Sequence, residues 1–167
     1  MSSAPTVMSN YTDPVFGTLD DDGHGYWSTT ITHGDLVVRA DLNLDGDVDA
    51  EQVARFSKKL DDVAKLETLA RKAMLADYDK KRSAVGMFRE RHEGILEAME
   101  SETCTPASKE DIGTFLKRCE LKRIALYPEC PGHCMILDFG FRLPVTDYML
   151  VVSFDGEDRV VGVDMQS

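Results

Sequence analysis

Residues Asp35–Tyr78, DLVVRADLNLDGDVDAEQVARFSKKLDDVAKLETLARKAMLADY, decide the fold because they contain a strand pattern, an acidic turn and a helix pattern in succession. Polar and apolar residues alternate through the first ten positions, as in a β-strand with one face in the core and one in water. We expect the core face to carry Leu36, Val38, Ala40, Leu42 and Leu44. We expect the wet face to carry Val37, Arg39, Asp41, Asn43 and Asp45.

A turn at Asp45–Asp47 ends this strand, and a long amphipathic helix follows the turn. Asp49 stands where an N-cap accepts backbone N–H bonds, and Gln52 three residues later completes a capping-box pattern. Apolar residues then recur every three or four positions as far as Met74, which is typical of a helix with one buried stripe. The helix therefore requires a sheet or another helix to cover its apolar side.

The acidic turn also resembles the first nine positions of an EF-hand calcium loop. The candidate calcium ligands are Asp41, Asn43, Asp45, Asp47 and Asp49. Against this interpretation, Gln52 replaces the glutamate that normally closes the loop, and an extended strand would turn the first two side chains away from a common centre. A calcium-binding domain stays an alternative to a strand–turn–helix junction whose acids are solvated or cap the helix.

The composition is that of one globular domain, because 167 residues with 43% hydrophobic and 29% charged side chains can bury a substantial core. We expect residues 1–13 to form a flexible tail and residues 14–167 to form a single domain. We find neither a signal-peptide pattern nor a membrane-spanning apolar stretch, so we expect a cytoplasmic protein. In that reducing compartment we expect free thiols at Cys104, Cys119, Cys130 and Cys134.

The net charge of −11 is concentrated near the N-terminus, since residues 1–52 contain ten acidic residues and one basic residue. Such a surface repels nucleic acid and anionic membranes, and it attracts cations or a basic protein partner. The acids expected to meet such a partner are Asp20, Asp21, Asp22, Asp45 and Asp47. The alternative is that the acidity only keeps the protein soluble.

The rest of the chain places strands before and after a central helical region. Strand patterns fall at 15–19 and 26–32, helix patterns at 85–99 and from a capping box at Ser108–Asp111 onward, and strand patterns again at 123–127, 134–141, 148–155 and 159–165. We predict an α+β fold with an antiparallel sheet, built from N-terminal and C-terminal strand meanders, and two or three central helices packed on one face. An exposed edge of this sheet would also allow a homodimer.

Other residues could carry chemistry of their own. Cys130, His133 and Cys134 could contribute to a zinc site, although a Pro-Gly turn before a strand explains the same residues. His92 lies on an apolar helical stripe, where a core histidine is expected more often than a catalytic base. An acid–base pair could come from Asp138, Asp147 and Asp164. No nucleophile, phosphate-binding or dinucleotide motif is present, so we assign no catalytic residue and no cofactor.

Three segments carry a family resemblance: Asp13–Leu19, Asp35–Asp79, and the closing Thr146–Ser167, TDYMLVVSFDGEDRVVGVDMQS. They resemble an uncharacterised bacterial family, a domain of unknown function. Its layout is similar to that of small acidic α+β immunity proteins that neutralise secreted bacterial toxins. The resemblance brings no functional residues. Together with the charge it implies a non-enzymatic bacterial protein-binding module with an acidic surface; the alternatives are a calcium-binding domain and an enzyme of unknown type.

Overall fold

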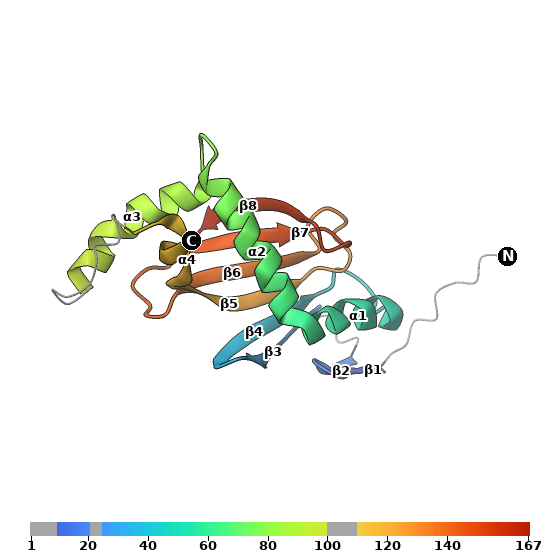
Figure 1. Cartoon of the computed structure of the whole chain (residues 1–167). Helices are drawn as coiled ribbons and strands as arrows, with labels where there is room; N and C mark the ends of the chain where they lie inside the picture. Colours follow the sequence, from blue (N-terminus) through green and yellow to red (C-terminus); the bar gives the residue numbers. More distant parts are fainter. Residues whose placement is uncertain (1–9, 21–24, 100–109) are drawn as a thin grey trace.

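The computed structural model describes residues 10–20, 25–99 and 110–167. Its strands are Asn10–Asp13 (β1), Gly17–Asp20 (β2), Tyr26–His33 (β3), Leu36–Asn43 (β4), Cys119–Leu126 (β5), Met135–Phe141 (β6), Met149–Phe154 (β7) and Val160–Gln166 (β8). Its helices are Ala50–Ser57 (α1), Val63–Tyr78 (α2), Ala84–Met99 (α3) and Ile112–Lys117 (α4), with the 3-10 segment Lys58–Asp62 (η1) between α1 and α2. Figure 1 shows how these elements are arranged. None of the described helices is both long and apolar enough to cross a membrane.

Strands β3 to β8 form one six-stranded sheet in chain order, and β1 pairs with β2 in a separate sheet. Neighbouring strands of the large sheet run antiparallel except β4 and β5, where Arg39 aligns with Arg123 and Leu42 with Leu126. A parallel pair needs a long crossover, and the helical region supplies it. The N-terminal and C-terminal strands therefore meet side by side, and the α+β prediction is confirmed. The strand predicted at 15–19 does not join this sheet, because β2 pairs with β1 instead of β3.

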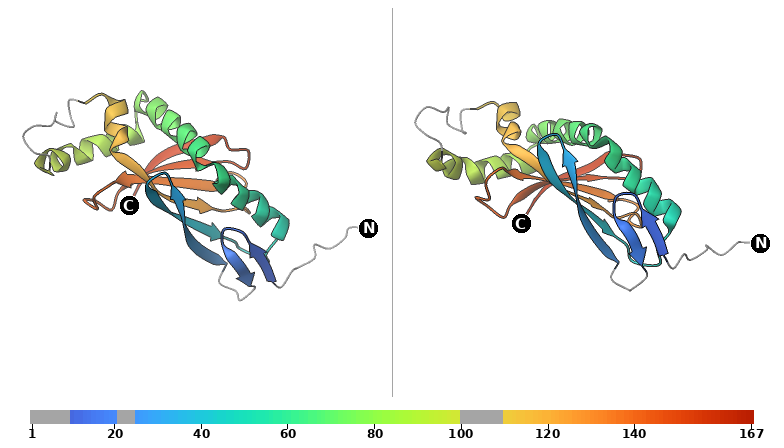
Figure 2. Two further views of the ribbon diagram at one scale, coloured as in Figure 1. Left: turned by 60° about the horizontal axis from the view of Figure 1, so that its bottom comes forward. Right: turned by 90° about the horizontal axis from the view of Figure 1, so that it is seen from below.

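The helices cover one face of the six-stranded sheet. Figure 1 shows α2 crossing in front of the strands, and Figure 2 shows α1 and α2 on the same side of the sheet. The largest fully buried side chains include Leu42, Phe56, Met74, Phe88, Phe115, Ile124, Phe139 and Phe154. In the part of the chain that Figure 2 describes, the opposite face carries no helix. We call it the open face, and it presents Ser28, Arg39, Asp41, Arg123 and Asp138.

Strand β4 has the predicted core face. Val38, Ala40 and Leu42 are fully buried, whereas Val37 on the open face is exposed. Asp41 was expected to face water, and this expectation is wrong. Its carboxylate is buried because side chains from β3 and β5 cover it.

The predicted long helix is divided in two. Asp49 begins α1 as predicted, since its carboxylate accepts the Gln52 N–H at 3.1 Å. After η1, Asp62 begins α2 by accepting the Lys65 N–H at 3.2 Å. The apolar periodicity runs through this junction without a break, so a second N-cap inside the stretch could not be told from an exposed acid.

The N-terminal hairpin begins earlier than expected, because β1 starts at Asn10 whereas the flexible tail was expected to reach Asp13. The Asp13 carboxylate is buried and connects the hairpin to α1. It accepts the N–H groups of Val15 at 2.8 Å and Phe16 at 3.0 Å, and the hydroxyl of Ser57 at 2.8 Å. These bonds shape the β1–β2 turn and fasten the hairpin to α1.

Candidate functional site

Acidic side chains from two distant parts of the sequence meet at one end of the sheet. Because β4 and β5 run parallel, the turns that follow them are neighbours. Glu129, after β5, accepts the Asp45 N–H at 2.5 Å, and Gln52 Nε2 donates to the Pro128 carbonyl at 2.8 Å. These contacts gather five exposed acids that we call the acidic end: Asp45, Asp47, Asp49, Glu51 and Glu129.

The acidic end contains two of the five acids predicted to meet a partner, Asp45 and Asp47. Asp21 and Asp22 lie outside the described residues, and at Asp20 the structure describes the backbone of β2 but not the side chain. Glu129 was not predicted, because it is 84 residues from Asp45. Only the parallel pairing of β4 with β5 reveals it.

The five candidate calcium ligands are not gathered around a common centre. Asp41 and Asn43 lie in β4, where Asn43 Nδ2 donates to the Leu126 carbonyl at 3.4 Å. Asp49 is engaged as the N-cap of α1. Throughout the residues that the structure describes, no three His, Cys, Asp or Glu side chains are placed to hold a metal ion. The calcium alternative thus gains no support from the geometry.

The candidate zinc ligands Cys130, His133 and Cys134 lie in the turn before β6. Cys130 and His133 are exposed, whereas Cys134 is buried and its thiol donates to the Cys130 carbonyl at 2.6 Å. Burial, together with nearby negative charge, raises the pKa of the Cys134 thiol, so the thiol stays protonated at neutral pH. Cys119, Cys130 and Cys134 are free thiols, as predicted, and Cys104 lies outside the described residues.

A buried carboxylate lies on the open face at β4, next to the edge strand β3. Asp41, with 1% of its side chain exposed, accepts hydrogen bonds from Ser28 Oγ at 2.7 Å and Arg39 Nε at 2.9 Å. Arg39 also donates to the Tyr26 hydroxyl. Burial alone would raise the pKa of Asp41, but hydrogen bonds from Ser28, Arg39 and Tyr26 outweigh burial and hold this pKa below its usual value. Asp41 is therefore charged at neutral pH.

Arg123 connects this carboxylate to a second one on β6. Its Nη1 donates to Asp41 Oδ2 at 3.5 Å, and its Nε donates to Asp138 Oδ2 at 2.7 Å. Burial raises the pKa of Asp138, and the charge of Arg123 opposes this effect only in part. Arg39 and Arg123 are aligned on adjacent strands, where like charges repel, and the two carboxylates offset that repulsion. We call Arg39, Asp41, Arg123 and Asp138 the arginine–aspartate row.

The row is built for stability rather than for acid–base catalysis. A general acid or base must reach a proton of the substrate, yet both oxygens of Asp41 are bonded to arginine and almost no part of it is exposed. The other acid–base candidates do not join the row. Asp147 lies in the β6–β7 loop, and Asp164 of β8 is separated from Asp138 by β7, with Val151 between them in register.

His92 is a core histidine, as predicted, with 1% of the residue exposed. Its Nδ1–H donates to the Phe88 carbonyl at 2.6 Å, so Nε2 is free to accept the Thr146 hydroxyl at 3.0 Å. Burial lowers the pKa of His92, and the charge of Arg91 lowers it further. The neutral ring packs on Phe141 at 5.2 Å between centroids and ties the β6–β7 loop to α3.

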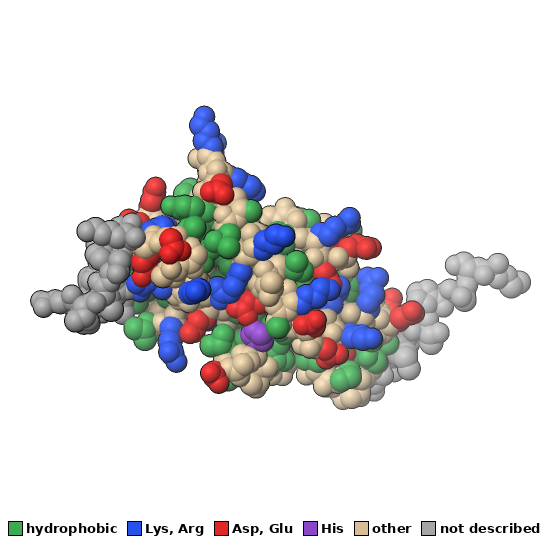
Figure 3. All heavy atoms as spheres, viewed as in Figure 1, with side chains coloured by type: hydrophobic (Ala, Val, Ile, Leu, Met, Phe, Trp, Pro, Cys, Tyr) green, Lys and Arg blue, Asp and Glu red, His purple; other side chains and the backbone are tan. Residues whose placement is uncertain are grey.

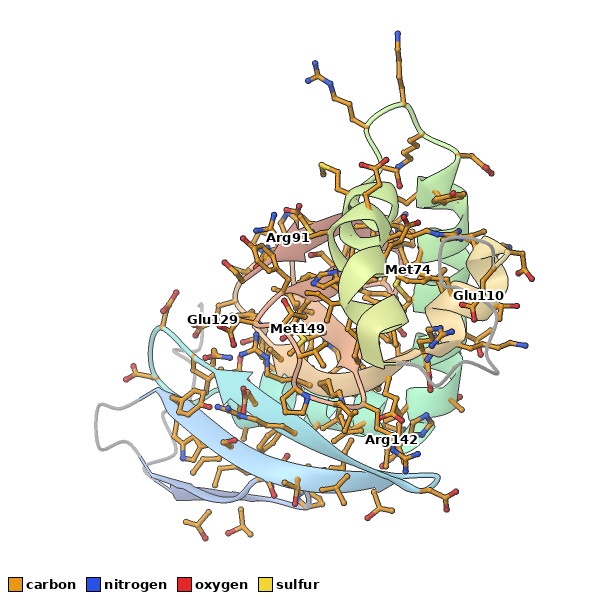
Figure 4. The ribbon with its side chains drawn as sticks, turned by 90° about the vertical axis from the view of Figure 1, so that its left-hand side faces the viewer. Met74, Arg91, Glu110, Glu129, Arg142 and Met149 are labelled. Carbon is orange, nitrogen blue, oxygen red and sulfur yellow. The ribbon has the colours of Figure 1, made fainter. Side chains whose placement is uncertain are left out.

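A cavity of about 360 Å³ lies at the end of the sheet opposite the acidic end. It forms where β5 begins and β6 ends, since Cys119 pairs with Phe141. Its walls are Leu96, Lys117, Arg118, Glu120, Phe141, Arg142, Leu143 and Val145. Figure 4, which views the molecule from this end, shows Arg142 beyond one end of α3. No sequence pattern indicated this cavity, because its walls come from α3, α4, β5, the end of β6 and the loop that follows β6.

No family model, no curated protein and no solved structure matches this chain. The resemblance to an uncharacterised bacterial family therefore stays a prediction. A case for function rests on three features of the molecule itself: the acidic end, the arginine–aspartate row and the cavity.

Proposed function

We propose that this protein is a non-enzymatic binding module whose acidic end docks a basic surface of another protein. The observation that supports this function best is the bond from the Asp45 N–H to the Glu129 carboxylate. This bond joins the acids that follow β4 to the loop that follows β5. Two segments that are far apart in the sequence therefore form one continuous surface. A basic residue, Arg55, lines a hollow on that surface together with Asp49 and Glu51.

The surroundings of the acidic end make it electrostatically distinct. Figure 3 shows basic and acidic side chains intermixed over the helix-covered face, as on an ordinary solvated surface. The acidic end instead gathers Asp45, Asp47, Asp49, Glu51 and Glu129 in one place. Grouped charges of one sign steer a partner of opposite sign during diffusion and raise the association rate. A basic protein partner therefore fits this surface better than an anionic one.

The location and the partner class follow from the sequence and form part of the same proposal. We place the protein in the bacterial cytoplasm, where its free thiols would remain reduced. The family resemblance favours a toxin that the protein neutralises as the basic partner. The exposed edge strand β3 leaves room for a homodimer through strand pairing, which would not cover the acidic end.

The decisive experiment compares two charge reversals that are equal in net charge. The test variant carries Asp45→Lys and Asp47→Lys, and the control carries Asp79→Lys and Glu90→Lys on exposed positions of the α2–α3 turn and α3. The tagged wild-type protein is first used to capture binding proteins from bacterial lysate at low and at high salt, and the captured protein is identified by mass spectrometry.

Association of the purified partner with each variant is then measured by stopped flow across a range of salt concentrations. We expect the test variant to associate about tenfold more slowly at low salt, with a flatter salt dependence, and the control to stay within about twofold of wild type. Equal association rates for the test variant and wild type would contradict the proposal. So would a lysate from which no basic protein is captured at either salt concentration, because the acidity would then serve solubility alone.

A further inference from the structure

We propose that the cavity between α3, α4 and the β6–β7 loop binds a small organic anion, meaning an apolar body that carries one carboxylate, sulfonate or phosphate group. This site is separate from the acidic end, and the inference does not rest on the proposed function. The argument has three parts: the apolar walls, the cationic rim and the fixed position of the loop.

The walls suit an apolar body. Leu96, Phe141, Leu143 and Val145 supply aliphatic and aromatic surface, and the volume of about 360 Å³ is that of a small-molecule site. Leu143 is 57% exposed, which is unusual for a large aliphatic side chain beside a hollow. A bound apolar group would remove this surface from water, and burial of apolar surface is the main source of affinity in such sites.

The rim has the opposite charge to the rest of the protein. Lys117, Arg118 and Arg142 line the cavity, and Glu120 is the one acid among the lining residues that the structure describes, although the chain as a whole has a net charge of −11. Arg118 Nε donates to Glu110 at 2.9 Å, so the positive charge available to a ligand comes from Lys117 and Arg142. Arg142 is 85% exposed, and its Nε lies 3.9 Å from a Glu120 oxygen, which is beyond hydrogen-bond distance. Glu120 also forms an ion pair with Lys122, whose Nζ lies 3.3 Å from the second Glu120 oxygen. The guanidinium of Arg142 therefore retains free donors, and guanidinium groups bind carboxylate, sulfonate and phosphate oxygens well.

The loop that carries Arg142 is already held in place. Thr146 donates to the buried His92 at 3.0 Å and accepts the Tyr148 N–H at 3.2 Å, and the Val145 N–H donates to the Leu143 carbonyl at 2.8 Å. The cavity therefore needs little ordering before a ligand enters. Preorganisation of this kind improves affinity because the entropy of ordering is not lost on binding.

The test uses two fluorescent probes that share the same rings. 1-Anilinonaphthalene-8-sulfonate carries one sulfonate, and N-phenyl-1-naphthylamine lacks it. The full-length variant Lys117→Gln/Arg142→Gln removes two rim charges, and Lys81→Gln/Arg82→Gln removes two charges from the exposed α2–α3 turn as a matched control. We expect saturable one-to-one binding of the sulfonate probe to wild type and to the control. The rim variant should bind the sulfonate probe about tenfold more weakly, yet bind the neutral probe within about twofold of wild type.

Chemical-shift mapping of the wild-type protein with the sulfonate probe locates the site independently. The largest amide shifts should fall on residues 141–145, 117–120 and around Leu96. Shifts spread over the open face, equal weakening by the rim and control variants, or equal affinity for the two probes would each overturn the inference. A cooperative urea transition of the rim variant with the midpoint of wild type, together with retained binding of the neutral probe, shows that a loss of sulfonate binding does not come from misfolding.

Discussion

Replacing Asp41 by alanine should destabilise the protein more than any change at an exposed acid. The carboxylate has 1% of its side chain exposed and accepts hydrogen bonds from Ser28, Arg39 and Arg123. Removing it deletes one hydroxyl bond and two bonds to guanidinium groups, and it leaves two aligned arginines on adjacent strands with Asp138 as their only counter-charge within the row.

The size of the effect follows from the exposure of the arginines. A bond to a charged group contributes about 1.5–3 kcal/mol and a neutral bond about 1 kcal/mol, whereas breaking a fully buried ion pair costs about 3–5 kcal/mol. Arg39 and Arg123 are 54% and 36% exposed, so water replaces part of what they lose. We expect Asp41→Ala to lower the free energy of unfolding by about 2–3 kcal/mol, which in a chain of this size lowers Tm by roughly 5–10 °C.

Urea unfolding at neutral pH measures this difference, with Asp47→Ala as the control because Asp47 is exposed. The control should change the free energy of unfolding by less than about 0.5 kcal/mol. A second arm uses pH. The pKa of Asp41 is lower in the folded protein than in the unfolded chain, so its contribution is fully present above the unfolded value of about 3.9 and is lost as pH falls through the folded value.

The stability difference between wild type and Asp41→Asn should therefore shrink at low pH. If Asp41→Ala loses no more stability than Asp47→Ala, the row contributes nothing measurable, and the reasoning from burial is refuted.

Four other predictions concern separate features. At Gly25, φ is +63° and a Cβ would stand 2.3 Å from the Leu44 carbonyl oxygen, so Gly25→Ala should cost more than about 1 kcal/mol in urea unfolding; a neutral result would contradict this turn geometry. The pKa of His92 is lower in the folded protein than its ordinary value of 6.5, so stability should fall as pH drops below that value, and thermal melts of His92→Phe should show a weaker dependence. Burial raises the pKa of Cys119 to about 12, so alkylation mapped by mass spectrometry should label Cys130 far faster than Cys119 unless denaturant is present. Millimolar calcium should leave Tm unchanged. A ligand that binds the native state raises Tm when it is in excess, so a higher Tm in calcium would support the calcium alternative instead.

Local patterns were enough to predict the elements that depend on nearby residues. The alternation in β4 predicted its buried residues Val38, Ala40 and Leu42, because side-chain period and burial are both set within one strand. The cap at Asp49 was predicted for the same reason, and it accepts the Gln52 N–H at 3.1 Å. The next short helix was predicted to begin at Ser108, which lies outside the described residues; Asp111 caps α4 instead, by accepting the Thr114 N–H at 2.9 Å.

Features that depend on strand pairing could not be predicted from one sequence. The alternation in β4 predicts that Asp41 faces solvent. Asp41 is buried because Ser28 and Arg123, from the strands on either side, cover its carboxylate. The parallel contact between β4 and β5 closes a connection that contains every helix of the fold, and periodicity within each strand does not specify its neighbour. Glu129 in the acidic end follows from this pairing, and Arg142 at the cavity follows from the antiparallel pairing of β5 with β6.

The acidic end and the cavity can be tested independently because β5 separates them. The acidic end follows the last residue of β5 and the cavity surrounds its first residues, so the two sites lie one strand length apart. Eight residues in an extended strand span roughly 26 Å, which is several times the Debye length of about 8 Å at physiological salt. Charge reversal at Asp45 and Asp47 should therefore leave binding of the sulfonate probe unchanged, and neutralising Arg142 should leave association with a basic protein unchanged. Coupling between the two sites would require a change in the sheet itself, and the arginine–aspartate row links three of its strands, β4, β5 and β6, against such a change.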